Sequence, residues 1–267
     1  MADRQPGSPP GVAGLPGGAA AEPPDAAPAY YARRGGRLAD WWTLLHPPYT
    51  VWHLSYVLIG AALAPRVDWV ALGATVLAFF LAVGLSAHAL DELTGRPLGT
   101  GIPAATLWAV AVGSLGGAVL LGVWGISRNG LVLVPFILAG VLLVFGYNLE
   151  LFGGRLHTDM GFAIAWGGFP VAVGFVAQAP GWGTPAASAT AGCAAAITLS
   201  YAQRRLSMPA KQLRRRAHSV TGEITYRDGT TVTVDRATLL APLEGALHAL
   251  SLTVALLAVA LLALHAH

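Results

Sequence analysis

The chain has 267 residues, 55% of which are hydrophobic and only 11% charged, and its mean hydropathy is +0.59. Soluble globular proteins carry about 25% charged residues, so the composition excludes a water-soluble enzyme. The apolar content also excludes a chain that is disordered throughout. The formal charge of +3 does not indicate a nucleic-acid partner, because arginine in an apolar chain is typical of cytoplasmic loops. We expect a polytopic protein of the cell membrane, with membrane lipids as partners and no nucleic acid.

The chain divides into a polar N-terminal tail and a membrane-embedded helical domain. Residues 1–28 consist largely of Pro, Gly and Ala and contain no apolar run of signal-peptide type, so we expect a disordered tail and not a cleaved leader. Residues 29–267 form the predicted membrane domain. At its start, residues 30–42 combine arginines with a tryptophan pair, a mixture typical of a segment at the level of the lipid headgroups.

Seven apolar stretches have the character of membrane spans. A helix needs about 20 apolar residues to cross the hydrocarbon core of a bilayer. The predicted spans fall near Thr50–Ala64, Trp69–Leu90, Ala104–Ile126, Leu131–Asn148, Met160–Ala177, Ser188–Tyr201 and Ala237–Leu264. We therefore expect an all-α polytopic membrane protein with about seven transmembrane helices, of which the first and the sixth are short.

The distribution of basic residues predicts the orientation of these spans. With the N-terminus in the cytoplasm, all but two of the 16 Lys and Arg residues lie on the cytoplasmic side, and the exceptions are Arg66 and Arg128. The reverse orientation would move the dense basic stretch at residues 204–216 out of the cell, against the positive-inside rule. We expect a cytoplasmic N-terminus and a C-terminus on the opposite side.

A basic cytoplasmic loop with a β-hairpin is expected between the sixth and seventh spans, over residues 203–236. Residues 222–235 read GEITYRDGTTVTVD, in which two alternating runs rich in β-branched residues flank Asp228 and Gly229. An Asp-Gly pair between such runs is a strong hairpin signal. The simplest interpretation is a small hairpin at the cytoplasmic surface.

The first group of acidic residues near the membrane follows the second span. In HALDELTGRPLGTGIP, Asp91 and Glu92 lie three and four residues after His88, which places all three on one face of a continued helix. Carboxylate oxygens of this kind bind Mg²⁺, which takes the rest of its ligands from water and substrate phosphates. Arg96 is suitably placed to bind a phosphate. In the alternative interpretation, the two acids are ordinary interfacial residues paired with Arg96.

A second polar group lies between the fourth and fifth spans, in YNLELFGGRLHTD, where Glu150 and Asp159 flank a turn that contains Arg155. The basic stretch QRRLSMPAKQLRRRA follows the sixth span, with Arg204 and Arg205 nearest to the membrane. This stretch has two interpretations. It is either an anchor on anionic lipids, worth about 1 kcal/mol per cation, or a set of cations that covers a bound diphosphate.

Three strings resemble the UbiA superfamily of intramembrane prenyltransferases, in the family's order along the chain. LHPPYTVWHLSYVLIGAALAP resembles its first helix, and HALDELTGRPLGTGIP is similar to the loop after its second helix. YNLELFGGRLHTDMGFAIAWGGFPVAVGF resembles its passage from helix four to helix five. The resemblance covers residues 43 to 177 and implies a UbiA-like helical bundle. About nine helices are common in that family, so the expected count is seven to nine.

The resemblance implies that the protein binds a prenyl diphosphate at its cytoplasmic mouth, with Mg²⁺ as cofactor and the isoprenoid chain in an apolar cavity. It implies roles for the polar residues named above: Asp91, Glu92, His88 and Tyr147 as catalytic residues, Asp91, Glu92, Glu150 and Asp159 as metal ligands, and Arg96, Arg155, Arg204, Arg205 and Asn148 as diphosphate-binding residues. The family's second Asp-rich motif would fall near Ser200–Arg216, a stretch that contains no acidic residue.

Three functions therefore stay open. The first is a prenyltransferase that moves an isoprenoid group from a prenyl diphosphate to a lipid-soluble or aromatic acceptor. The second is a non-catalytic relative that binds an isoprenoid, quinone or other lipid, which the missing acidic motif favours. The third is a small transporter that uses the membrane acids as an ion relay. It is the least favoured, because the acids cluster near one interface whereas transporter sites lie near the midplane.

Overall fold

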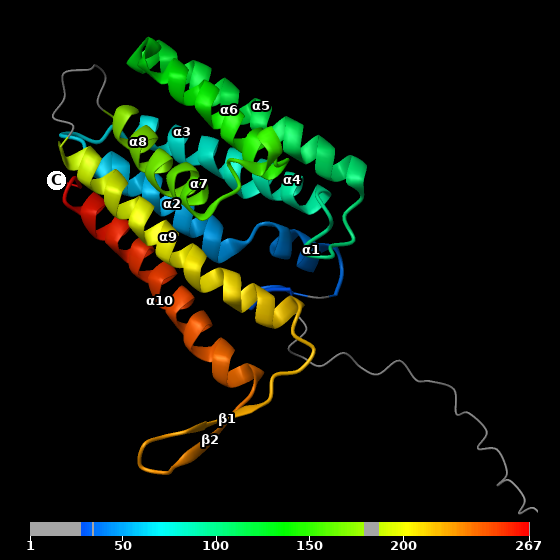
Figure 1. The fold of residues 1–267 in the computed structure, drawn as a ribbon. Helices are drawn as coiled ribbons and strands as arrows, with labels where there is room; N and C mark the ends of the chain where they lie inside the picture. The colour runs from blue at the N-terminus through cyan, green and yellow to red at the C-terminus, as the bar shows by residue number, and fades with distance from the viewer. Residues whose placement is uncertain (1–27, 34, 179–186, 267) are drawn as a thin grey trace, which may run out of the picture.

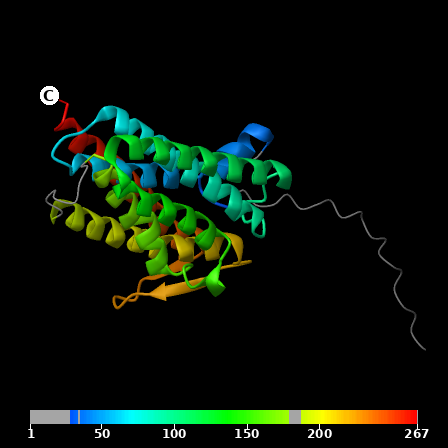
Figure 2. The same ribbon diagram turned by 90° about the horizontal axis from the view of Figure 1, so that it is seen from above.

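Long helices make up most of the structure, a computed structural model that describes residues 28–33, 35–178 and 187–266 (Figure 1). The predicted disordered tail, residues 1–28, lies outside these described residues apart from Pro28. The long helices run roughly side by side (Figures 1 and 2). In chain order the helices are α1 (Arg37–Leu44), α2 (Pro47–Ala62), α3 (Trp69–Phe79), α4 (His88–Leu93), α5 (Ala104–Asn129), α6 (Val134–Asn148), α7 (Asp159–Ala163), α8 (Phe169–Val176), α9 (Ala187–Arg215) and α10 (Arg236–Ala263).

Several of these helices join end to end into longer rods. The π-helical segment η2 (Phe80–Ala87) connects α3 to α4, and η5 (Ile164–Gly168) connects α7 to α8. A 3₁₀ turn, η3 (Leu131–Leu133), leads directly into α6, and another, η4 (Phe152–Gly154), lies between α6 and α7. Single π-helical turns occur frequently at functional sites, and both of these lie in rods that carry site residues.

Among the residues that the structure describes, five rods have the length and apolar composition of membrane spans, so the protein is a multi-pass, mostly helical membrane protein. The five are Trp69–Leu93, Ala104–Asn129, Leu131–Asn148, Asp159–Val176 and Arg236–Ala263. The predicted spans near residues 50–64 and 188–201 are also helical. However, α2 has only 16 residues and the second half of α9 is basic. The predicted count of seven to nine spans is therefore not confirmed.

Helix α2 packs most closely against α8 and α10, and its contact with α8 depends on two glycines. A Cβ atom on Gly60 would lie 2.1 Å from the carbonyl oxygen of Val171, and one on Gly174 would lie 2.3 Å from the carbonyl oxygen of Val57. Small residues allow this close approach of helix backbones, and the resulting packing contacts help to hold helices together in lipid.

Replacing Gly174 with alanine is therefore expected to lower the stability of the protein. The added methyl group would overlap backbone atoms of α2, so the free energy of unfolding should fall by about 1–3 kcal/mol. Gly73→Ala is the matched control, because a Cβ atom on Gly73 meets nothing within 4 Å. Thermal unfolding of the two purified variants in detergent checks this prediction. Equal melting temperatures would contradict the close packing of α2 on α8.

The connections between helices gather at two ends of the bundle (Figure 1). One end, called the basic end below, holds the connections from α4 to α5, from α6 to α7 and from α9 to α10. The described chain begins there, where Arg215 Nε donates to the carbonyl oxygen of Pro28 over 3.0 Å. It finishes at the opposite end, where His265 Nε2 donates to the carbonyl oxygen of Ala62 over 2.8 Å.

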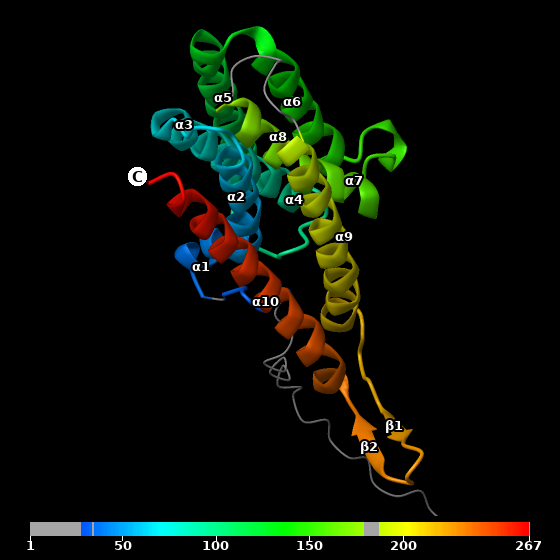
Figure 3. The same cartoon turned by 90° about the vertical axis from the view of Figure 1, so that its left-hand side faces the viewer.

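The predicted hairpin is confirmed: β1 (Gly222–Thr225) and β2 (Thr231–Val234) pair antiparallel, with Ile224 opposite Val232. Gly229 in the turn has a φ of +85°, a conformation that glycine adopts without strain. The hairpin extends from the basic end beyond the start of α10 (Figure 3).

The predicted basic loop is in part a helix. Residues 203–215 continue α9, which ends only at Arg215. The extension packs along α10, where Arg214 binds both carboxylate oxygens of Glu244, with Nη2 2.7 Å from Oε2. Bidentate pairs of this kind are among the stronger charge-assisted hydrogen bonds. The basic stretch is therefore a fixed wall of the bundle at this end.

Candidate functional site

The inner face of α9 is polar towards the basic end. Ser200, Gln203 and Ser207 recur at intervals of three and four residues and are all buried. Half-buried Lys211 follows at the next such interval. Residues with this spacing share one face of a helix. Because burial of polar groups costs free energy unless they find partners, this face indicates a polar interior in place of an ordinary apolar core.

The side chains around this face, called the polar cluster here, come from five parts of the fold. Its members are His46 at the start of α2, His88 and Asp91 of α4, Tyr147 of α6, His157 before α7, and Arg204 and Lys211 of α9. The rings of His46 and His88 stack with centroids 4.4 Å apart, and those of Tyr147 and His157 with centroids 4.5 Å apart. Asp91 interacts electrostatically with Lys211 and with His157 of the second ring stack.

Cations outnumber acids in the polar cluster. Half-buried Asp91 has no side-chain hydrogen bond among the described residues, and it faces Lys211 and Arg215. Burial lowers the pKa of the Lys211 amine to about 8, and the neighbouring Asp91 opposes that shift while Arg215 and Arg204 add to it. A cleft lined by charges of one sign concentrates ligands of the opposite sign. The polar cluster is therefore suited to an anionic ligand.

His46 of the polar cluster has one ring nitrogen without a partner. The residue is 8% exposed, and its Nδ1 lies 2.6 Å from the hydroxyl group of Tyr31. Its Nε2 is buried and has no partner among residues 28–33, 35–178 and 187–266. Burial and the neighbouring His88 hold the pKa of His46 well below its usual value, so the ring is neutral at physiological pH. An unpartnered buried donor or acceptor is costly, which makes Nε2 a candidate contact for a ligand.

Tyr147 lies where the polar cluster meets apolar residues. Its hydroxyl oxygen is buried without a partner in the described part of the chain. On the other side, the Tyr147 ring meets the edge of Trp166, with centroids 5.6 Å apart. Trp166 in turn lines an apolar cavity. The two aromatic rings therefore form the boundary between a polar compartment and an apolar one.

The apolar cavity has a volume of about 130 Å³ and lies among α3, α5, α6 and α8. Small residues of the α3 rod, spaced three or four positions apart, leave this space open. Gly122 and Gly125 have the same effect on α5. Phe79, Trp166 and Phe169 contribute aromatic walls. The alanines of the α3 rod that line it are Ala71, Ala74, Ala78 and Ala82.

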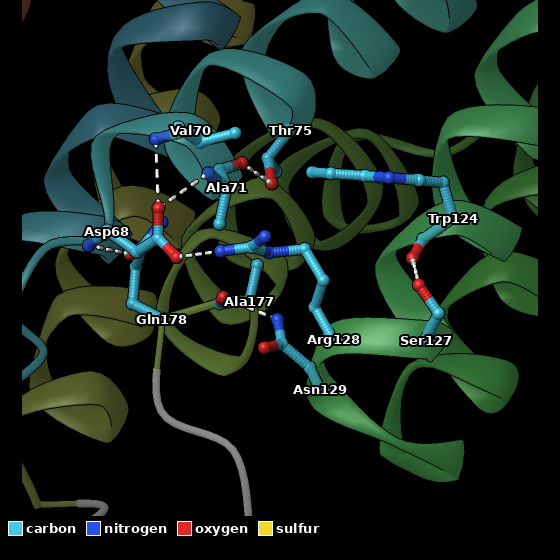
Figure 4. Close-up of polar contacts among 10 residues, drawn as sticks. All are labelled: Asp68, Val70, Ala71, Thr75, Trp124, Ser127, Arg128, Asn129, Ala177 and Gln178. Carbon is cyan, nitrogen blue, oxygen red and sulfur yellow. Dashed lines mark hydrogen bonds and ion pairs between the residues drawn. The ribbon is translucent and has the colours of Figure 1, made fainter.

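Polar contacts join the helix ends at the far end of this cavity (Figure 4). Asp68 forms an ion pair with Arg128, and its backbone N–H donates to Oε1 of Gln178 over 2.7 Å. Asn129 donates to the carbonyl oxygen of Ala177 over 2.6 Å. Hydrogen bonds from the α3 backbone and from Arg128 hold the pKa of the Asp68 carboxyl below its usual value. These contacts tie the ends of α5 and α8 to the start of α3.

Glu92 and Arg96, two of the predicted site residues, hold the loop after α4. The Glu92 carboxylate, fully buried, accepts hydrogen bonds from the backbone N–H groups of Leu98 (2.9 Å) and Thr100 (2.8 Å) and from the Thr100 hydroxyl (2.9 Å). Arg96 donates to the carbonyl oxygens of Thr100 and Ile102. Glu92 therefore points away from Asp91, although the two are neighbours in the sequence.

The remaining predicted residues lie around the connection from α6 to α7. Asp159 pairs with Arg204 Nε at 3.2 Å and with Arg205 at 3.7 Å. Glu150 is 59% exposed and lies 3.8 Å from His157. Asn148 donates to a carbonyl oxygen of its own helix, and Arg155 is exposed.

These positions do not fit a Mg²⁺ site built by the protein alone. No group of three or more His, Cys, Asp or Glu side chains among the described residues is arranged to hold a metal ion. The oxygens of Glu92 are bound by the loop and those of Asp159 by arginines. Of the four predicted acidic ligands, Asp91 alone combines an uncommitted carboxylate with a place in the polar cluster.

The structure thus brings four of the sequence-predicted residues together in the polar cluster, His88, Asp91, Tyr147 and Arg204, and adds His46 and Lys211. Two signals in the sequence pointed to the added residues without identifying them. His46 precedes the proline pair of the first UbiA-like string, and Lys211 belongs to the basic stretch after the sixth predicted span. No family model, curated protein or solved structure matches this chain.

Proposed function

We propose that this protein binds a prenyl diphosphate and transfers its isoprenoid group to a lipid-soluble or aromatic acceptor, as its resemblance to the UbiA superfamily implies. One observation carries the proposal: the cation-rich polar cluster adjoins the apolar cavity across Tyr147 and Trp166. A prenyl diphosphate has the same two parts, a strongly anionic head and an apolar chain. Ligand pockets combine an apolar lining with a few well-placed polar groups in this way.

In the proposed reaction, the bond between the first carbon of the isoprenoid and the diphosphate oxygen breaks, and the diphosphate leaves with the bonding electrons. Lys211, Arg204 and Arg215 stabilise the negative charge that develops on the leaving group. The allylic cation is shielded from water by the apolar cavity and faces the rings of Trp166 and Tyr147, which attract cations. The acceptor forms the new carbon bond and passes its displaced proton to the released diphosphate.

No step of this proposal depends on a metal ion, because of the four predicted acidic ligands only Asp91 combines an uncommitted carboxylate with a place in the polar cluster. The proposal gives Asp91 a positioning role: it keeps Lys211 and His157 directed into the polar cluster, since it interacts with both.

The proposal includes an orientation in the cell membrane. The basic end faces the cytoplasm, where soluble prenyl diphosphates reach it, and seven helices cross the bilayer, so the C-terminus lies on the opposite side. The Lys and Arg residues concentrated at the basic end support this orientation through the positive-inside rule.

A second candidate function is lipid binding without catalysis. It is favoured by Glu92, which the resemblance makes a catalytic acid but whose carboxylate is bound by Leu98 and Thr100. A protein of this kind would hold an anionic isoprenoid lipid and leave its carbon–oxygen bond intact.

Diphosphate release from a panel of prenyl diphosphates, with lipophilic acceptors and with or without Mg²⁺, tests the proposal. We expect release by the wild-type protein and release slower by about 100-fold in Asp91→Ala, because misplacement of the groups that Asp91 positions has an effect of this size. Full activity of Asp91→Ala would contradict the assigned site. Tight binding of every donor without release would establish the second candidate instead.

A further inference from the structure

A short N-terminal segment lies over the polar cluster at the basic end. This segment, Pro28–Arg33, is called the strap here. At its start, Pro28 accepts a hydrogen bond from Arg215 of α9. Tyr30 then packs on His248 of α10, with ring centroids 4.1 Å apart. The strap thus begins on the outer wall formed by α9 and α10.

The other end of the strap is held by α1. The backbone N–H of Arg33 donates to the Thr43 hydroxyl over 2.9 Å, and that hydroxyl donates back to the carbonyl oxygen of Arg33 over 3.1 Å. Trp42 Nε1 donates to the carbonyl oxygen of Tyr31 over 3.1 Å. The strap therefore spans from α9 to α1 and crosses the start of α2 between them.

Midway along the strap, Tyr31 connects it to the polar cluster. The Tyr31 hydroxyl lies 2.6 Å from Nδ1 of His46, and its ring meets the edge of Tyr49. A small space of about 20 Å³ separates the strap from Lys211. The other nitrogen of His46, Nε2, is buried and has no partner among the described residues. One imidazole ring therefore contacts the strap through Nδ1 and keeps Nε2 available for a ligand.

A neutral imidazole has one proton, so its two nitrogens cannot both donate. A diphosphate oxygen only accepts hydrogen bonds, and at Nε2 it would select the tautomer with the proton on Nε2. Nδ1 is then an acceptor, which is the state that receives the hydroxyl proton of Tyr31. The occupied site and the closed strap favour the same tautomer, so each stabilises the other.

We propose that the strap is a cover that closes on a bound diphosphate, and that His46 is the positioning residue that couples ligand and cover. This inference rests on the proposed function, which identifies the ligand as a prenyl diphosphate. It adds a way in which the diphosphate head is enclosed. When the strap is closed, it covers the side of the polar cluster that faces water, and the anionic head of the ligand contacts Nε2 of His46.

Amide hydrogen exchange on the full-length protein in detergent tests the proposal. The reporters are the backbone N–H groups of Ala32 and Arg33, which are both hydrogen-bonded in the strap. We expect inorganic pyrophosphate to slow their exchange about fivefold, the effect of one added hydrogen bond. Geranyl diphosphate, which carries the same head on an isoprenoid chain, is compared with pyrophosphate. If both ligands slow amide exchange equally, the strap covers a diphosphate attached to a lipid. If only pyrophosphate slows exchange, the strap covers the free ion.

Two tyrosines of the strap provide a matched pair of variants. Tyr31→Phe removes the hydroxyl that contacts His46, so we expect the slowing by pyrophosphate to disappear. Tyr30→Phe should keep it, because the Tyr30 hydroxyl has no partner in the described part of the chain. Equal behaviour of the two variants would overturn the proposal.

His46→Asn separates the two contacts of the imidazole. Asparagine tolerates the left-handed conformation of residue 46, whose φ is 46°, and offers a group near the position of Nδ1 but none at Nε2. We expect the strap to stay protected without ligand and the slowing by pyrophosphate to be lost. Pyrophosphate binding to the wild-type protein without slowing would overturn the cover alone. Failure of both diphosphates to bind would overturn the proposed function as well.

Discussion

Filling the apolar cavity is expected to weaken the binding of farnesyl diphosphate. Ala78 lines the cavity from α3, and Ala78→Trp would occupy the space that the chain needs. We expect the affinity for farnesyl diphosphate to fall about 200-fold, because exclusion of about four CH₂ groups costs about 0.8 kcal/mol each. Binding of inorganic pyrophosphate should stay within about twofold, since distant sites contribute independently. Equilibrium binding of both ligands to the purified variant measures the two effects.

The control is a tryptophan of equal size on the lipid-facing surface. Ala109 on α5 is exposed and does not line the cavity, so Ala109→Trp should bind farnesyl diphosphate as the wild-type protein does. Equal loss of affinity in both variants would mean that the chain does not lie in this cavity. A loss of pyrophosphate binding in Ala78→Trp would show that the polar and apolar compartments are not separable.

The affinity for geranyl diphosphate is expected to fall about tenfold between pH 7 and 9, with a midpoint near 8, because one cation of the site loses its proton. Burial lowers the pKa of Lys211 from 10.5 to about 8, and the nearby charges are those of Asp91, Arg204 and Arg215. Lys211 is therefore charged at pH 7 and largely neutral at pH 9. The ligand stays fully charged, since its last phosphate pKa is about 6.

Two variants assign this pH dependence to one side chain. Lys211→Arg keeps its charge to above pH 12, so its affinity should not change between pH 7 and 9. Lys211→Met should show at every pH the weak affinity that the wild-type protein reaches at pH 9. Titration calorimetry at three pH values makes the comparison. A pH dependence that survives in Lys211→Arg would contradict the assignment.

The same pKa shift has a consequence for stability. The unfolded chain binds the Lys211 proton more tightly than the folded chain does, because its pKa is 10.5 when solvated and about 8 in the fold. The free energy of unfolding contributed by this residue should therefore rise as the pH increases from about 8 to 10.5. Burial of Lys211 thus costs stability at neutral pH, as is common for groups that serve a binding site.

The membrane rods and the hairpin follow from local patterns. An apolar run of about 20 residues predicts a membrane helix, and an Asp-Gly turn between β-branched runs predicts a hairpin. In both cases the backbone hydrogen bonds form between residues of the same segment, so the local sequence is sufficient. The prediction was less certain where the pattern is mixed. Residues 203–215 continue α9 and pack along α10, where Arg214 pairs with Glu244, a partner 30 residues away that the basic stretch itself does not reveal.

The candidate site depended on contacts that no local spacing determines. Spacing from His88 predicts one shared helix face for Asp91 and Glu92, but it does not show that Glu92 turns to the loop at Leu98 and Thr100. Arg204 and Asp159 pair across 45 residues, and the His46 ring stacks on His88 across 42. Pairs of this kind depend on how the rods pack against one another. Residue types and their spacing therefore predict which side chains are polar or charged, but not which of them form pairs.

The central claim, that one ligand spans the polar cluster and the apolar cavity, is tested most directly by photochemical crosslinking. A farnesyl diphosphate analogue with a diazirine at the end of its chain is bound to the full-length protein, irradiated and mapped by mass spectrometry. We predict crosslinks to the cavity walls on α3, α5 and α6, at residues such as Ala78, Val119 and Val141, and their loss when excess pyrophosphate competes for the head. Crosslinks confined to lipid-facing residues such as Ala109, or unaffected by pyrophosphate, would contradict the claim.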